Sequence, residues 1–284
     1  MYQVKLGMAI NSGFGLPLEE QVRLLKQTGF ESFFSYWSAA DGSTSKLKAL
    51  ADELGLDYHS LHAPGRHINA IWEEGPHADA LMQELNLCLQ DSIDNQIPVV
   101  VMHAIAGFTY PAPTEVGLRH MASLLAMLEG TQTKIAIENL QSEEFHKAFL
   151  DHFKGHPNFG FCWDTGHEMA YRLKDQMAQF GDQLIYTHLH DNLGSRDRNG
   201  ALSPQDDLHL LPFDGIGDWP AIAQALAASG YQGPLTFELK IQQNRHEHDT
   251  YRNMPIEQYF AESYKRVCRV GSLFCRAKFS YEKD

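Results

Sequence analysis

The chain has 284 residues, with 43% hydrophobic and 21% charged side chains, which are ordinary values for a soluble globular protein. No run of residues approaches the ~18 apolar side chains of a membrane span, so we expect no membrane contact. The formal net charge of -13 argues against a nucleic-acid partner, because such partners usually require a basic surface. A small molecule is the expected partner.

The N-terminal residues run directly into an apolar, strand-like segment and show none of the regions of a secretory signal. We therefore expect a cytoplasmic protein. The cysteines are scattered and have no CxxC spacing, which predicts neither a disulfide framework nor a zinc knuckle. They are Cys88, Cys162, Cys268 and Cys275.

Short apolar, β-rich runs recur along the whole chain. They cover residues 4–10, 30–37, 56–63, 97–104, 134–140, 159–166, 184–192 and 235–240. Segments with helical spacing of apolar residues lie between them, as at Leu18, Val22 and Leu25. Strands that alternate with helices predict parallel pairing with right-handed crossovers, and eight such units close into a barrel.

An open, doubly wound sheet is the competing fold. That fold usually carries a GxGxxG motif after its first strand, and this sequence has none there. We therefore predict an α/β fold with a single (β/α)8 TIM barrel domain over residues 1–284, a length compatible with the roughly 250 residues of such barrels. The final helix, at residues 255–275, either covers the barrel or contributes to a homo-oligomer.

Side chains that commonly bind metals end six successive predicted strands. They are His62, His103, Glu138, Asp164, His188 and Glu238. The carboxyl ends of barrel strands meet at one rim, where active sites form. A single buried glutamate is equally well explained by an ion pair, but two of them, joined by an aspartate and a histidine, fit a divalent cation best. The predicted metal ligands are Glu138, Asp164, His188 and Glu238.

Further residues at the same rim are candidates for additional metal or substrate binding. His62 and His103 are either core histidines bonded to the backbone or ligands, and their positions at the rim favour ligands. His167 follows the sixth strand and either holds a neighbouring ion or caps the loop. Asp207 and His209 form a D-x-H motif, which presents a carboxylate and an imidazole to one ion unless the loop is simply solvated.

His188 and His190 alternate along one strand and share a face, so one of these two imidazoles is expected to bind the metal. Asp191 either orients an imidazole ring or belongs to a turn at the strand end. His59 lies three residues deeper than His62 in the third strand and is expected to be structural.

Short motifs at the strand ends form an ordered set. They are His62-Ala63-Pro64, His103-Ala104, Ile137-Glu138-Asn139-Leu140, Trp163-Asp164-Thr165-Gly166-His167, Thr187-His188-Leu189-His190-Asp191-Asn192, Asp207-Leu208-His209 and Phe237-Glu238. Taken together over residues 4–240, they resemble the xylose isomerase-like barrel superfamily. That superfamily contains sugar and sugar-phosphate isomerases and epimerases, inosose-processing enzymes and endonuclease IV.

In the isomerase and epimerase branch, the resemblance implies one Mn²⁺, Mg²⁺, Co²⁺ or Zn²⁺ ion bound to a sugar, sugar phosphate or polyol. The ligands would be the residues at Glu138, Asp164, His188 and Glu238. The metal would stabilise an enediolate, while Glu138 and Glu238 exchange protons at opposite faces of the reacting carbon.

In the endonuclease IV branch, the resemblance implies three zinc ions that activate water for phosphoester hydrolysis. All nine ligand positions are kept here: His62, His103, Glu138, Asp164, His167, His188, Asp207, His209 and Glu238. The loops at the rim are mixed in charge rather than basic, which favours the isomerase or epimerase. A barrel that has lost catalysis and only binds a ligand is a third alternative.

Substrate contacts are expected from Arg66, Trp72, His190 and Arg196. An arginine in a rim loop either clamps a phosphate or simply solvates the surface. Trp72 either forms an apolar wall for a sugar or packs in the core. The loop at residues 210–217 departs from the Pro-Gly-x-Gly usual in relatives, because Phe213 follows Pro212.

Overall fold

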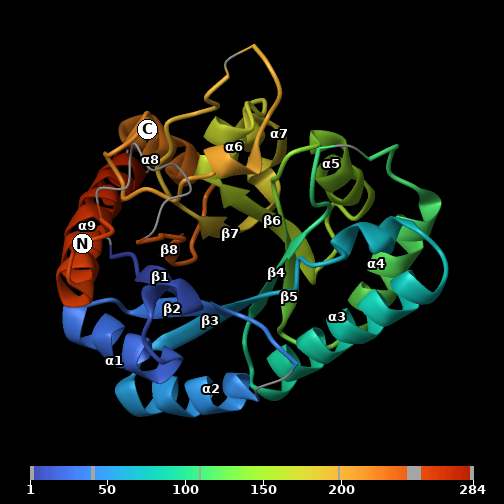
Figure 1. The fold of residues 1–284 in the computed structure, drawn as a ribbon, viewed down its shortest axis with the longest axis horizontal. Coiled ribbons are helices and arrows are strands. Elements are labelled where there is room, and N and C mark those ends of the chain that lie inside the picture. Colours follow the sequence, from blue (N-terminus) through green and yellow to red (C-terminus); the bar gives the residue numbers. More distant parts are fainter. Residues whose placement is uncertain (1–2, 40–41, 109, 198, 242–250, 282–284) are drawn as a thin grey trace.

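The computed structural model describes residues 3–39, 42–108, 110–197, 199–241 and 251–281. Eight parallel strands form one sheet in the order β7-β6-β5-β4-β3-β2-β1-β8 (Figure 1). The strands are β1 (Leu6–Ile10), β2 (Ser32–Tyr36), β3 (Asp57–His62), β4 (Val99–His103), β5 (Lys134–Glu138), β6 (Phe159–Asp164), β7 (Leu184–His188) and β8 (Leu235–Phe237).

The two ends of this sheet meet between β7 and β8. Leu189, directly after β7, forms a parallel bridge with Phe237. Its amide donates to the Thr236 carbonyl at 2.8 Å, and the Glu238 amide donates to the Leu189 carbonyl at 3.2 Å. Closing the sheet in this way removes its exposed edges. The predicted (β/α)8 TIM barrel is therefore confirmed.

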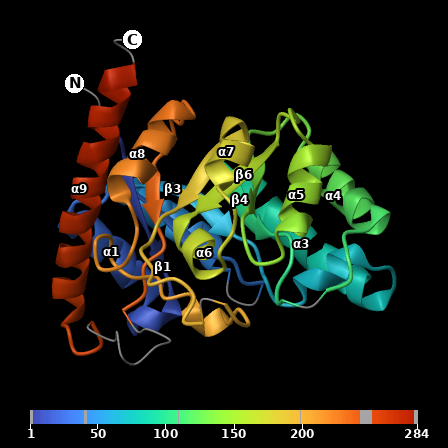
Figure 2. The same ribbon diagram turned by 90° about the horizontal axis from the view of Figure 1, so that it is seen from above.

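Helices surround the strands. They are α1 (Leu18–Thr28), α2 (Ser43–Leu54), α3 (Pro76–Asp94), α4 (Glu115–Met127), α5 (Glu143–His152), α6 (Thr165–Ala170), α7 (Gln176–Phe180), α8 (Trp219–Ala228) and α9 (Ile256–Tyr281). The final helix, α9, runs alongside α8 and also contacts α1 and β1 (Figure 2). It therefore covers the barrel, as one of the two sequence-based alternatives expects. Among the described residues, no helix is long and apolar enough to cross a membrane.

The signals for helix starts and ends operate as their chemistry predicts. Asp218 caps α8 by accepting the Ala221 amide at 3.1 Å. Gly29 ends α1 with a φ of 112°, a left-handed conformation that favours glycine. A Cβ atom at Gly29 would also lie 2.7 Å from the ring of Tyr264 in α9, so the packing of α9 requires glycine there.

Most predicted strands end earlier than the apolar pattern indicates, and two of them illustrate the cause. The run at 159–166 stops at Asp164, because the Asp164 carboxylate accepts the His167 amide at 2.7 Å and thereby caps α6. The run at 184–192 stops at His188, and the chain beyond it forms isolated bridges. Both strands therefore end on a polar side chain.

Candidate metal centre

The register of the strands places the polar side chains at one level. His103 at the end of β4 is paired with Glu138 at the end of β5, and Asp164 at the end of β6 is paired with His188 at the end of β7. Glu238 directly follows β8. Because all strands run in the same direction, these side chains converge at the carboxyl end of the barrel, as the sequence predicts.

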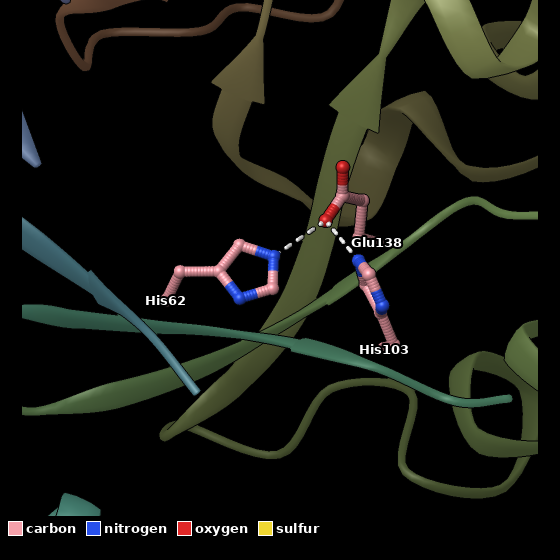
Figure 3. Close-up of side chains that lie close together, drawn as sticks. All are labelled: His62, His103 and Glu138. Atoms are coloured by element: carbon pink, nitrogen blue, oxygen red, sulfur yellow. Dashed lines mark hydrogen bonds and ion pairs between the residues drawn. The ribbon is translucent and has the colours of Figure 1, made fainter. Parts of the chain in front are cut away.

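Glu138 lies at the centre of the cluster and is fully buried. Its Oε2 atom faces the Nε2 atoms of His62 and His103 at 3.3 Å and 3.1 Å, and Figure 3 shows both rings pointing at this oxygen. Its Oε1 atom faces the Nδ1 atoms of His167 and His188 at 3.3 Å and 3.1 Å. One carboxylate therefore contacts four imidazoles, two on each oxygen.

In the part of the chain that the structure describes, the ligand-type atoms fall into three groups, and within each group they lie within 4.8 Å of one another. We call these the outer group (His62, His103, Glu138), the central group (Glu138, Asp164, His188, Glu238) and the loop group (His167, Asp207, His209). Glu138 belongs to two of them. All nine candidate ligands read from the sequence are thus brought together by the fold.

The donors of the central group fit a divalent cation. The Nδ1 atom of His188 lies 3.1 Å from Glu138 and 3.2 Å from Glu238. An imidazole nitrogen carries at most one hydrogen, so it cannot form a full hydrogen bond to both carboxylates. Three buried carboxylates and one imidazole match the oxygen and nitrogen donors that hard to borderline divalent ions prefer.

The outer and loop groups fit a cation for a second reason. The Nδ1 atom of His62 bonds to the Ala63 carbonyl at 2.8 Å, and the Nδ1 atom of His209 bonds to the Glu238 carbonyl at 2.9 Å. These bonds place the hydrogen of a neutral ring on Nδ1 and leave a lone pair on Nε2. Each Nε2 atom nevertheless faces a carboxylate oxygen. Nε2 of His62 lies 3.3 Å from Glu138, and Nε2 of His209 lies 2.7 Å from Asp207. A proton or a cation is needed between them.

The electrostatics of the cluster agree with this interpretation. Burial raises the pKa of the Glu138 carboxyl, but the imidazoles of His188, His103 and His167 outweigh burial and hold the pKa well below its usual range. Burial lowers the pKa of His188, but the carboxylates of Glu138 and Glu238 raise it to about 10. Protons on the rings and a divalent cation are therefore alternative ways to balance the buried carboxylates.

The structure separates the two histidines of the HLHD motif. His188 approaches both glutamates of the central group through Nδ1. His190 instead contacts Asp164 of that group through Nε2 at 3.1 Å, and its ring stacks on His209 of the loop group at 4.0 Å. Both rings are fully buried. His188 is therefore the histidine of the central group, and His190 supports two other members of the cluster.

The Asp191 carboxylate anchors the turn after the strand and does not orient an imidazole ring. Its carboxylate accepts the amides of Phe213 and Gly217 at 2.8 Å and 2.9 Å, and the indole N–H of Trp219 at 2.9 Å. These bonds fix the path of the loop at residues 210–217. Phe213 there adopts a φ of 75°, at the point where the loop departs from the usual glycine.

A cavity of about 760 Å³ opens onto this cluster. The residues that line it include Ile10, Leu16, Pro17, Leu18, Tyr36, Trp37, His62, His103, His167, Asp207, His209, Glu238 and Lys240. Glu238 reaches the cavity, while Glu138, Asp164 and His188 lie behind its lining. Of the two predicted catalytic carboxylates, Glu238 is therefore the one directly accessible to a small molecule.

The four residues expected to contact substrate lie elsewhere. Trp72 is buried in the core, where its ring stacks on Phe149 at 4.4 Å and its N–H donates to the Ala104 carbonyl at 2.7 Å. Arg66 and Arg196 are exposed. The fourth residue, His190, is buried in the cluster. None of the four is among the described residues that line the cavity.

The structure also brings Tyr36 and Lys240 to the cavity, and sequence reasoning did not select either of them. The available signal was their position at the ends of the predicted strands 30–37 and 235–240. Neither side chain is a common metal ligand, so the pattern of ligand types does not predict either of them. Tyr36 donates a hydrogen bond to Glu238 at 2.6 Å.

A family model described as xylose isomerase-like TIM barrel matches residues 16–263. An uncharacterised protein of Sinorhizobium fredii is 29% identical over 262 residues, covering 78% of this chain and 80% of that protein. Among solved structures, the IOLI protein with a bound zinc atom is 16% identical, with a TM-score of 0.73 over 94% of this chain and 98% of that one. An L-ribulose 3-epimerase is 17% identical, with a TM-score of 0.71 over 99% of this chain and 97% of that one.

The structural likenesses have low sequence identity and show the fold. The family model covers well over half of the sequence and includes the strand ends from β2 to β8 that carry the three groups. This chain therefore belongs to the xylose isomerase-like TIM barrel family.

Proposed function

We propose that this protein is a divalent-metal-dependent isomerase or epimerase that acts on a sugar, a sugar phosphate or a polyol. The observation that carries the proposal is the central group, in which Glu138 and Glu238 approach the same nitrogen of His188 at 3.1 Å and 3.2 Å. Two carboxylates beside one cation suit proton exchange at opposite faces of a carbon next to a carbonyl. The likeness to an epimerase and to a zinc-containing barrel supports it.

The residues of the central group have different roles in the proposed reaction. A bound divalent cation would polarise a substrate carbonyl and stabilise negative charge on its oxygen. Glu238 lines the cavity, so we assign to it the removal of a proton from the adjacent carbon. Glu138, on the deeper side, would enter the step protonated and give its own proton to the opposite face of that carbon, so that Glu238 ends protonated and Glu138 ends ionised. Asp164 and His188 would hold the cation.

A multi-metal phosphoester hydrolase is the second candidate, and a specific observation favours it. The two oxygens of Glu138 face different sets of imidazoles, so this carboxylate would serve as a ligand in both the outer and the central group. The loop group offers a third set of ligands. Two or three ions close together can hold a phosphate and activate water.

Metal stoichiometry separates the two candidates. We would measure metal content by inductively coupled plasma mass spectrometry on protein purified without chelator, alongside His209→Ala. About one ion per chain, unchanged in His209→Ala, supports the isomerase or epimerase. Two or three zinc ions, with one lost in His209→Ala, support the hydrolase.

The reaction itself is tested by screening ketoses, inososes and their phosphates for epimerisation, and bis-p-nitrophenyl phosphate for hydrolysis. Under the proposal, Glu238→Gln abolishes epimerisation, because the amide cannot accept the proton, and Glu138→Gln does the same. Circular dichroism checks that both variants remain folded. Full activity in either variant would contradict the proposed mechanism. The exposed Glu129→Gln serves as the control and is expected to keep full activity.

A further inference from the structure

Tyr36 occupies an unusual position for a large aromatic residue. It is the last residue of β2, its side chain lines the cavity, and it is 37% exposed. In the sheet order β2-β1-β8, the strand β1 separates Tyr36 from Glu238. The Tyr36 side chain reaches across the end of β1, and its hydroxyl donates to Oε1 of Glu238 at 2.6 Å.

The ring of Tyr36 is held on its other side by the outer group. Its centroid lies 5.3 Å from that of His62, with 30° between the ring planes, and 5.8 Å from that of Phe34. Strand pairing fixes this arrangement, because Tyr36 and His62 are partners in the register of β2 and β3. One side chain thus contacts the outer group through its ring and the central group through its hydroxyl.

The hydrogen bond distinguishes the two oxygens of Glu238. Oε1 accepts the Tyr36 hydroxyl at 2.6 Å, whereas Oε2 lies 3.2 Å from Nδ1 of His188. A carboxylate free to rotate about its last bond would exchange these oxygens. A short bond from a neutral hydroxyl to an anionic oxygen is among the stronger hydrogen bonds in proteins, and it restrains that rotation.

We propose that Tyr36 is a positioning residue, whose hydroxyl holds Oε1 of Glu238 so that Oε2 faces the cation of the central group. The inference rests on the metal site of the proposed function but not on the identity of the substrate. The phenol acts here as a neutral donor, and the cavity leaves its ring accessible to a bound molecule.

The test compares Co²⁺ binding by the full-length protein and by Tyr36→Phe, followed through the visible absorption of the bound ion. The substitution keeps the ring beside His62 and removes only the hydroxyl. Loss of a hydrogen bond to a charged group is expected to weaken Co²⁺ binding about tenfold. The visible band should also shift, because Glu238 then meets the ion in a different orientation.

Tyr110→Phe is the matched control. The Tyr110 hydroxyl also donates to a glutamate, Glu73, but this pair lies outside the three groups. Its removal should leave both the Co²⁺ affinity and the spectrum unchanged. A double variant, Tyr36→Phe with Glu238→Ala, should bind Co²⁺ no more weakly than Glu238→Ala alone, because alanine leaves the Tyr36 hydroxyl no oxygen to hold.

An affinity within twofold of the wild type, together with a superimposable spectrum in Tyr36→Phe, would overturn the inference and leave the metal site intact. So would a tenfold effect of Tyr36→Phe that persists in the Glu238→Ala background. If the wild-type protein fails to bind Co²⁺ at all, the metal site of the proposed function fails, and the role of Tyr36 falls with it.

Discussion

His188 is held between two carboxylates without any exposure to solvent, and this position makes its protonation a direct competitor of metal binding. Burial acts to lower the pKa of the ring, but Glu138 and Glu238 raise it to about 10. Below that pH the metal-free ring carries a proton on the side that a cation would need. Metal binding must therefore release this proton.

The expected result is that metal affinity rises with pH. Across pH 6 to 9, a cation that displaces the His188 proton should bind about tenfold more tightly for each unit of pH increase. Burial lowers the pKa of His167, but the carboxylates of Asp164 and Asp207 raise it well above its usual range. A second proton released from His167 would make the slope steeper. Calorimetric titration of Mn²⁺ in buffers with different ionisation enthalpies counts the protons. An affinity that does not change between pH 6 and 9 would exclude the central group as the site.

The sequence predicted where side chains gather when a residue type and a strand end coincide. All nine ligand-type side chains at predicted strand ends or in the D-x-H loop lie in the cluster, because the parallel register carries them to one rim. Trp72 shows why the substrate contacts were harder to predict. A tryptophan next to a rim loop has the same sequence signature whether its ring points at the cavity or, as here, stacks on Phe149 in the core.

The loop between β7 and α8 depends on one buried side chain. Asp191 accepts the backbone amides of Phe213 and Gly217 and the indole of Trp219, the first residue of α8. A Cβ atom at Gly215 would lie 2.2 Å from the Asp191 carboxylate, so the loop is drawn tightly around it. This loop also determines where the backbone leaves His209.

Asp191→Asn should therefore destabilise the protein. An amide has one acceptor oxygen, and its NH₂ group would face donors, so at least one buried N–H loses its partner. We expect the free energy of unfolding in urea to fall by about 3 kcal/mol. Asp197→Asn is the control, because Asp197 accepts two loop amides in the same way but is exposed, and it should change stability by less than about 1 kcal/mol. Equal effects of the two substitutions would contradict the anchoring role of Asp191.

Element boundaries were predictable only where the sequence signals an end. The glycine after α1 and the aspartate before α8 mark helix ends through their own backbone or capping chemistry, and the structure places both ends there. Residues 165–166 gave no such signal, because the Asp164 carboxylate both ends a strand and caps the helix that follows at once. A continuous apolar run cannot reveal that double role.

At the scale of the whole barrel, the candidate metal ligands lie at the ends of β3 to β8 and in the loop after β7, and none lies in β1 or β2. The sheet closes between β7 and β8 through the short pairing of Leu189 with Thr236, Phe237 and Glu238. The central group spans this seam, with Asp164 and His188 on one side and Glu238 on the other. By contrast, β1 and β2 are joined by a regular four-residue register, and none of the candidate ligands belongs to them.

A cation in the central group would therefore clamp the seam more than the rest of the barrel. Bound at a hundred times its dissociation constant, it adds about 2.7 kcal/mol to any opening that breaks the site, which corresponds to roughly a hundredfold slower exchange. We expect removal of metal with EDTA to accelerate amide hydrogen exchange at Leu189 and Glu238 by up to about this factor, while the amides of Gly7 and Met8 change little. Uniform acceleration around the barrel would instead mean that the metal stabilises only the global fold. In Glu238→Gln, which lacks the carboxylate that the β8 side contributes to the central group, EDTA should have no further effect on the seam, because the cation can no longer join its two sides.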